Sequence, residues 1–191
     1  MILKVLTFPD PILRKRAQKV TEVTAKLRRL AENMLETMYA SRGIGLAAPQ
    51  VGESIRLLVL DTRPKDENGQ VILEEMTELE RAIVQPLVIF NPQIIKSEGK
   101  TSFEEGCLSV PTYFETVTRS LLVEAKALNI EGKEIHLVTD GLLAVCLQHE
   151  IDHLDGKLFI DRLSLVKSNR IKSKIKKFGY TQEEAESSPA G

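Results

Sequence analysis

The sequence is poor in the residues that build disulfide frameworks and membrane spans. Its 191 residues include no Trp, six Phe, three Tyr and only two Cys. Two cysteines are too few for a disulfide framework, which favours a reducing compartment in which a thiol stays free to bind metal. No apolar run approaches the ~20 residues that a membrane span needs, and Pro9 interrupts the short apolar start too early for a signal peptide. We therefore expect a cytoplasmic protein with no membrane partner.

An excess of charge of either sign is also missing. The chain has 26 Lys and Arg against 27 Asp and Glu, and its formal net charge is -1. The chain as a whole therefore has no general attraction to nucleic acid or to anionic lipid. The length suits one domain with a sizeable core, which we expect over residues 1–178. Residues 179–191 are polar, have little to bury and are expected to form a flexible tail.

Histidine is scarce, and two of the three histidines lie four residues apart. His149 and His153 form the pattern H-E-x-x-H, with Glu150 beside the first. On an α-helix, residues four apart lie on one face. Both imidazoles can then hold one metal ion, with the glutamate positioned as general base. A buried helix that carries two histidines and no metal is the alternative interpretation of this pattern alone.

The surrounding residues predict that this pattern lies on a helix. Residues 142–155 contain no Gly or Pro, and apolar side chains recur at three- and four-residue spacing. We expect Asp140 to cap the start of this helix and Gly156 to end it.

A catalytic metal site usually has a third protein ligand, for which the candidates are Cys107, Cys146, His136 and several acids. Cys146 lies three residues before His149, but the metal would lie about 7 Å further along the helix axis. Helical side chains also lean towards the N-terminus, so we interpret Cys146 as a small apolar wall residue. Cys107 follows Gly106 and is the better candidate, with a buried inert thiol as the alternative. A thiolate with two imidazoles suits zinc or ferrous iron.

The rest of the chain predicts an α+β fold with mainly antiparallel sheets, because strands and helices do not alternate regularly. We expect amphipathic helices over residues 24–41 and 164–178 and a short helix over 77–85. Asn91 and Pro92 are expected to end a strand. The predicted strands are 55–61, 87–90, 93–95, 113–117, 120–129 and 133–138.

Three stretches resemble the motifs of the peptide deformylase family. Residues 43–50 read G-I-G-L-A-A-P-Q, residues 105–109 read E-G-C-L-S, and residues 149–153 read H-E-I-D-H. They occur in the family's order and span most of the chain. The resemblance implies antiparallel sheets packed around a central metal-binding helix, with a C-terminal helix. It also implies a metal-dependent hydrolase that removes the N-formyl group from the initiator methionine of new polypeptides and releases formate.

The resemblance assigns roles to individual residues. It implies that the metal ligands are Cys107, His149 and His153 and that Glu150 is the catalytic acid and base. It implies two oxyanion donors, the side chain of Gln50 and the backbone N–H of Leu108. The implied metal is Fe2+ in the cell, with Zn2+, Ni2+ or Co2+ as substitutes.

The implied substrates are N-formylmethionyl peptides. The small residues at the start of the first motif suit backbone pairing with an extended peptide. We expect that substrate contacts come from Gly43, Ile44, Gly45, Leu142, Val145 and Cys146. Leu142, Val145 and Cys146 would line the methionine pocket. The alternative is that they only pack in the core, and for Val145 this alternative is nearly as well supported as pocket lining.

Two segments leave alternatives open. Residues 63–86 are longer than the usual link in the family, and they either fold away or cover the cleft. The predicted C-terminal helix carries six cations and no acid: Lys167, Arg170, Lys172, Lys174, Lys176 and Lys177. If Leu165, Ile171, Ile175 and Phe178 dock one face, these cations point outward. These cations then either contact ribosomal RNA or aid solubility. We expect the protein itself to be a monomer.

Two other functions are compatible with parts of this sequence. A zinc peptidase would share H-E-x-x-H, but its third ligand would be a downstream acid such as Asp161 or an acid after it. A non-catalytic peptide-binding or ribosome-binding domain would normally lack a ligand or the base, and none is missing from this sequence.

Overall fold

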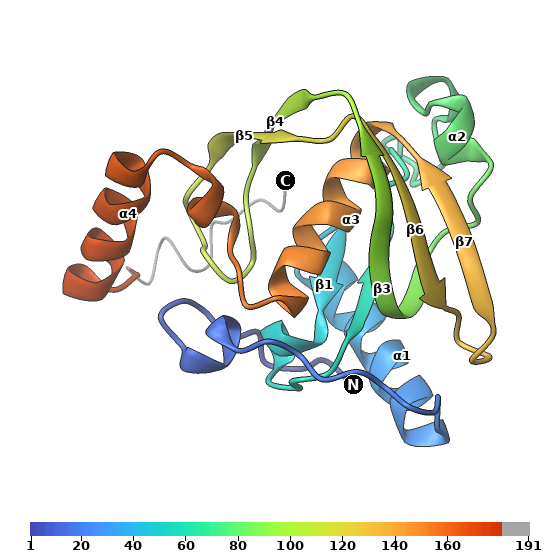
Figure 1. The fold of residues 1–191 in the computed structure, drawn as a ribbon, viewed down its shortest axis with the longest axis horizontal. Helices are drawn as coiled ribbons and strands as arrows, with labels where there is room; N and C mark the ends of the chain where they lie inside the picture. Colours follow the sequence, from blue (N-terminus) through green and yellow to red (C-terminus); the bar gives the residue numbers. More distant parts are fainter. Residues whose placement is uncertain (181–191) are drawn as a thin grey trace.

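The computed structural model describes residues 1–180, and a single helix lies at its centre. This helix, α3 (Gly141–Leu154), is surrounded by two sheets and by the helices α1 (Ala25–Ala40) and α4 (Leu165–Phe178) (Figure 1). All the residues of α3 from Leu143 to Leu154 are buried. The polar side chains in its second half therefore need partners inside the protein.

The larger sheet has five strands in the order β1-β2-β3-β6-β7, and every neighbouring pair is antiparallel. The smaller sheet is the antiparallel hairpin of β4 and β5. The predicted α+β fold with mainly antiparallel sheets is confirmed. The strand bounds are β1 Gly45–Ala47, β2 Leu57–Leu60, β3 Leu87–Glu98, β4 Thr101–Glu105, β5 Glu115–Arg119, β6 Leu122–Leu128 and β7 Glu134–Thr139. Short helices are η1 Pro11–Arg14, η2 Ala48–Val51, η3 Leu73–Glu75, α2 Glu78–Arg81 and η4 Phe159–Arg162.

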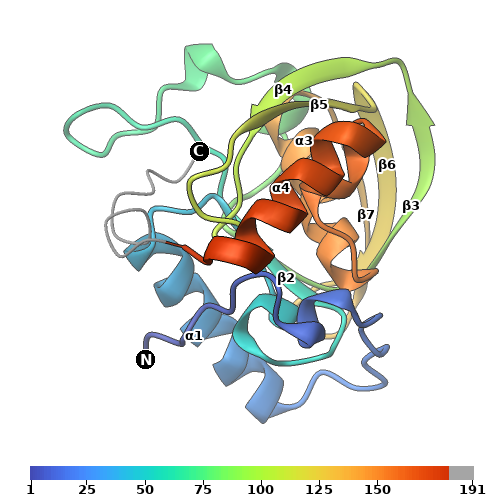
Figure 2. The ribbon, with the colours of Figure 1, turned by 90° about the vertical axis from the view of Figure 1, so that its left-hand side faces the viewer.

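Helices α1 and α4 pack on different parts of the molecule. The predicted apolar stripe of α1 buries Ala31, Met34 and Met38 against β1 and β2. Helix α4 packs through Ile171 and Ile175 into a separate cluster with η4 and the chain's N-terminal segment, and it crosses in front of α3 (Figure 2). The candidate site lies along α3, beside the loop that follows β4.

Several local predictions are wrong. Asn91 and Pro92 do not end a strand, because β3 continues through them with a register shift between Phe90 and Gln93. Asn91 adopts a φ of 52°, and its side chain bonds both backbone groups of Val20. These hydrogen bonds stabilise a β-bulge at Asn91. Asn91 and Pro92 therefore mark a bulge within β3, whereas the sequence predicted the end of a strand. Strand β4 was not expected at all.

The predicted docking face of α4 is wrong at its two ends. Leu165 and Phe178 are 76% and 69% exposed, and only the central pair, Ile171 and Ile175, is buried. Most of the predicted tail, residues 181–191, lies outside the described residues. Within residues 1–180 no helix has both the length and the apolar character to cross a membrane.

Candidate active site

Three side chains that could hold a metal ion converge where α3 meets the loop after β4. The potential ligand atoms of Cys107, His149 and His153 all lie within 4.8 Å of one another. Cys107 Sγ lies 3.2 Å from His153 Nε2, and the two imidazole centroids are 5.0 Å apart. Because the donors are one thiol and two imidazoles in a buried place, they fit a single divalent ion such as zinc or ferrous iron.

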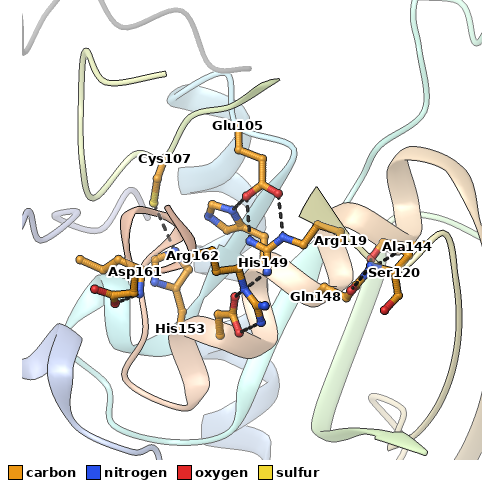
Figure 3. Close-up of polar contacts among 12 residues, drawn as sticks. Glu105, Cys107, Arg119, Ser120, Ala144, Gln148, His149, His153, Asp161 and Arg162 are labelled. Carbon is orange, nitrogen blue, oxygen red and sulfur yellow. Dashed lines mark hydrogen bonds and ion pairs between the residues drawn. The ribbon is translucent and has the colours of Figure 1, made fainter. Parts of the chain in front are cut away.

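The orientation of His149 is fixed from behind by a carboxylate. His149 Nδ1 lies 2.8 Å from Glu105 Oε2, which leaves the other ring nitrogen for the site (Figure 3). Burial disfavours charge on His149, but hydrogen bonds with Cys107 and Glu105 outweigh it and raise its pKa. Burial and the charge of His149 lower the pKa of His153 well below its usual range. A carboxylate behind a ligating histidine is the common way to hold its ring and tautomer.

Glu105 belongs to a buried ion network that ties the site together. Arg119, with a fully buried side chain, donates two bonds of 2.7 Å to Glu105 and one of 2.5 Å to Asp152. Arg162 donates two more bonds to Asp152. Burial opposes ionisation of Glu105, but the bonds from Arg119 and His149 prevail and lower its pKa to about 2. The network joins β4, β5, α3 and η4 around the back of His149 (Figure 3).

Sequence reasoning did not identify the network. Glu105 was noted only as part of a motif, and Arg119 and Asp152 were not singled out. No local pattern marks them, because each is charged and its burial depends on partners 10 to 44 residues away.

Glu150 faces the pocket beside the three potential ligands. Its side chain is buried, its Oε2 has no hydrogen-bond partner among the described residues, and burial raises its pKa to about 7. A Cβ on Gly45 would lie 2.5 Å from Glu150 Oε1 and 2.8 Å from Cys146 Sγ. A larger residue at position 45 would therefore displace the Glu150 carboxylate or the Cys146 thiol.

The Gln50 side chain is held with its amide NH₂ facing the cysteine loop. Its Oε1 accepts from Ala47 N at 2.8 Å, and its Nε2 donates to Ser109 Oγ at 3.2 Å and towards Cys107 Sγ at 3.7 Å. Leu108 follows Cys107 directly and lines the same pocket. The structure therefore brings Gln50 and Leu108 next to the three potential ligands.

The pocket holds about 740 Å³ of empty space, its open mouth included. All six residues predicted to contact substrate line it, namely Gly43, Ile44, Gly45, Leu142, Val145 and Cys146. The sequence did not point to the aromatic residues on its rim, Phe103, Tyr113 and Phe114. No residue of the long segment 63–86 is among its lining residues.

The alternative ligands considered from the sequence are elsewhere. Cys146 Sγ lies 3.8 Å from the carbonyl of Ile44 and is outside the group of potential ligands. Asp161 pairs with Arg14 and with Lys172. His136 lies on the exposed face of β7, 2.7 Å from Glu124. The described residues therefore do not bring a downstream acid to the two histidines, as a zinc peptidase would require.

A helix that turns two imidazoles towards a thiol, with an unpaired glutamate between them, is suited to activating water with a metal. The fold and the site thus define a metal-dependent hydrolase. Comparison with known proteins narrows this class, because the family model described as polypeptide deformylase matches residues 2–169. The chain belongs to the peptide deformylase family, and it removes the N-formyl group from newly made polypeptides.

Individual relatives agree with this membership. A peptide deformylase of Alkalilimnicola ehrlichii is 46% identical over 176 residues, which cover 92% of this chain and 90% of that protein. One from Acinetobacter baumannii is 46% identical over 95% of this chain and 94% of its own length. The crystal structure of an Ehrlichia chaffeensis peptide deformylase has 38% identity and a TM-score of 0.81 and covers 95% of this chain and 99% of that chain.

Proposed function

We propose that this chain releases formate from the initiator methionine of new polypeptides with one divalent metal ion, held by Cys107, His149 and His153. The observation that carries the proposal is the convergence of these three donors within 4.8 Å, next to a buried glutamate with an unpaired oxygen. A bound divalent ion would supply Lewis acidity, which lowers the pKa of water and polarises a carbonyl. Fe2+ is the ion proposed in the cell, and Zn2+, Ni2+ or Co2+ suit the same donors.

In the proposed reaction, Glu150 moves the proton. Its carboxylate takes a proton from the attacking water and then gives it to the leaving amine of methionine, so one residue serves as base and as acid. The water oxygen forms the new bond to the formyl carbon, and the C–N bond breaks. The buried position of Glu150 in the pocket wall supports this role because it keeps the carboxylate next to the reacting atoms.

Two groups of this chain would stabilise the oxyanion that forms on the formyl oxygen. The Gln50 amide is pinned by Ala47 and Ser109, so its NH₂ needs no rearrangement to donate. The Leu108 N–H would be the second donor. Fixed donors of this kind contribute about 10²–10³ in rate each.

The peptide would extend the sheet at its free edge. Within residues 1–180, strand β1 pairs with β2 and with no second strand, so the backbone of residues 43–45 is proposed to pair with an extended substrate. Leu142, Val145 and Cys146 would then enclose the methionine side chain. An Ehrlichia chaffeensis deformylase has been solved in complex with actinonin, and we propose that actinonin also binds in the pocket of this chain.

We also propose that the enzyme acts in the cytoplasm and contacts the ribosome through α4, where formylated chains emerge. Lys167 and Lys172 pair with Glu115 and Asp161, whereas four other cations of α4 are exposed. These four are Arg170, Lys174, Lys176 and Lys177. Such a local cationic face on a near-neutral protein suits phosphate contacts.

The experiment compares a short formyl-methionyl peptide with the same peptide lacking the formyl group. We expect release of formate from the first and no internal cleavage of either, and we expect actinonin to inhibit the reaction. Cleavage of the unformylated peptide at an internal amide, without formate release from the formylated one, would contradict the proposal.

A further inference from the structure

The N-terminus of α3 is capped by a residue from the long segment 63–86. Asp140 occupies the N-cap position as expected, but its side chain makes no capping hydrogen bond with the helix. Instead, its Oδ1 accepts a 2.5 Å bond from Thr77 Oγ1. The N–H of Leu143 donates to Glu80 Oε1 at 3.0 Å. The cap therefore comes from a residue 63 positions earlier in the chain.

Glu80 is built into this position from both sides. It is only 4% exposed, and its second oxygen accepts from Thr77 N at 2.9 Å within the capping box of α2. A Cβ on Gly141 would lie 2.6 Å from Glu80 Oε1, so the carboxylate rests directly on the glycine backbone. Gly141 also has a φ of 61°, which favours glycine. A carboxylate at a helix N-terminus is further stabilised by the helix dipole.

The capped turn carries part of the pocket wall. Leu142, next to the capped N–H of Leu143, lines the pocket, and Val145 and Cys146 follow one turn later. His149 and Glu150 lie two turns from the cap, and the Glu105–Arg119 network holds His149 separately. Loss of the cap should therefore loosen the wall around the substrate side chain and leave the reacting groups in place.

We propose that Glu80 is a positioning residue for substrate selectivity, acting through the first turn of α3 and Leu142. This inference rests on the proposed function, and it gives a role to the segment 63–86. The segment does not line the pocket itself but fixes the helix turn that does.

The test measures kcat and KM for a formyl-methionyl and a formyl-alanyl tripeptide with Glu80→Ala, Glu80→Gln and the control Glu78→Ala. Glu78 lies on the same short helix and is exposed. For Glu80→Ala we expect the Met-over-Ala ratio of kcat/KM to fall about three- to tenfold, mainly through KM for the methionyl substrate. Glu80→Gln keeps an acceptor for Leu143 N and should recover part of the ratio. Glu78→Ala should match the wild type, and metal content should be unchanged in all variants.

Hydrogen exchange of the Leu143 amide provides a readout that does not depend on activity. Faster exchange in Glu80→Ala, together with the lower selectivity, supports the proposal. Faster exchange with unchanged selectivity in both Glu80 variants would show that Glu80 only stabilises the helix, and it would overturn the proposal. A wild-type protein that releases no formate would instead overturn the proposed function, so the two failures are distinguishable.

Discussion

Two cysteines of the same chemistry have different surroundings in this protein. Cys107 is half-buried beside His153, whereas Cys146 is fully buried beside the Ile44 carbonyl, and burial raises the pKa of its thiol. A metal needs a thiolate, which the surroundings of Cys146 disfavour. The two cysteines therefore differ in metal-binding ability because of where the fold places them, since their residue type is the same.

We expect Cys107→Ser to lose most of its metal and Cys146→Ser to keep it, because only Cys107 lies with both histidines. The measurement is metal analysis of protein purified without oxygen. Full metal content in Cys107→Ser would refute the proposed ligand set.

Glu150→Gln should keep the fold and the metal but lose turnover by about 10²–10⁴-fold, because the amide cannot accept the proton. Formate release and metal content are measured on the same sample. Near-normal turnover would mean that another group is the base.

Asp61 predicts a pH dependence of stability. Burial disfavours its charge, but hydrogen bonds from Arg63 and Tyr39 prevail and lower its pKa to about 2. Because the folded pKa is below the unfolded value of about 4, this contribution of about 2 kcal/mol is present above about pH 5 and is lost as pH falls towards 2. Asp61→Asn should therefore be less stable than the wild type at neutral pH, with a smaller difference in acid. Denaturant unfolding at several pH values measures this, and a difference independent of pH would contradict it.

At the scale of elements, α4 combines a packing face and a charged face. Ile171 and Ile175 are buried, so deleting the helix would uncover the cluster it packs against. Changing exposed cations tests the surface without this damage.

We expect the triple change Arg170→Gln, Lys176→Gln and Lys177→Gln to weaken ribosome co-sedimentation at low salt and to leave cleavage of a short formyl-peptide unchanged. The salt dependence should also become shallower, because fewer phosphates are neutralised. The control replaces the exposed Lys19, Lys26 and Lys133 by Gln. Equal ribosome binding by the two variants would mean that the α4 cations only aid solubility.

Across the molecule, one buried ion network connects the β4–β5 hairpin to the central helix α3. Arg119 contacts Glu105 on β4 and Asp152 on α3, and Arg162 extends the network to η4. Such networks are costly to break, because the remaining charges are left buried and unpaired.

Arg119→Met should therefore lower the free energy of unfolding by about 3–5 kcal/mol. The control is Arg29→Met, whose exposed pair with Glu32 should be worth less than about 1 kcal/mol. Denaturant unfolding of both variants checks the prediction. A similar small loss in the two would show that the network does not stabilise the fold.

Local pattern was sufficient for part of the fold and most of the candidate site. The spacing of apolar residues predicted α1 and α3, and the three motifs contain every potential metal ligand. Strand β4 was missed because T-S-F-E-E has no clear alternation of apolar residues, and its pairing with β5 stabilises it. The bulge at Asn91 was missed because it depends on bonds to Val20, 71 residues away.

The order of the amino acids is enough to show which chemical groups are available: a thiol in a glycine-containing loop, and two imidazoles and a glutamate at helical spacing. Which of these groups meet depends on the folded chain. It brings Cys107 to α3, buries Arg119 between two acids and places Glu80 over the start of the helix. The physical reason is that the energy of a buried charge depends on its partners in space, and residues far apart along the chain supply these partners.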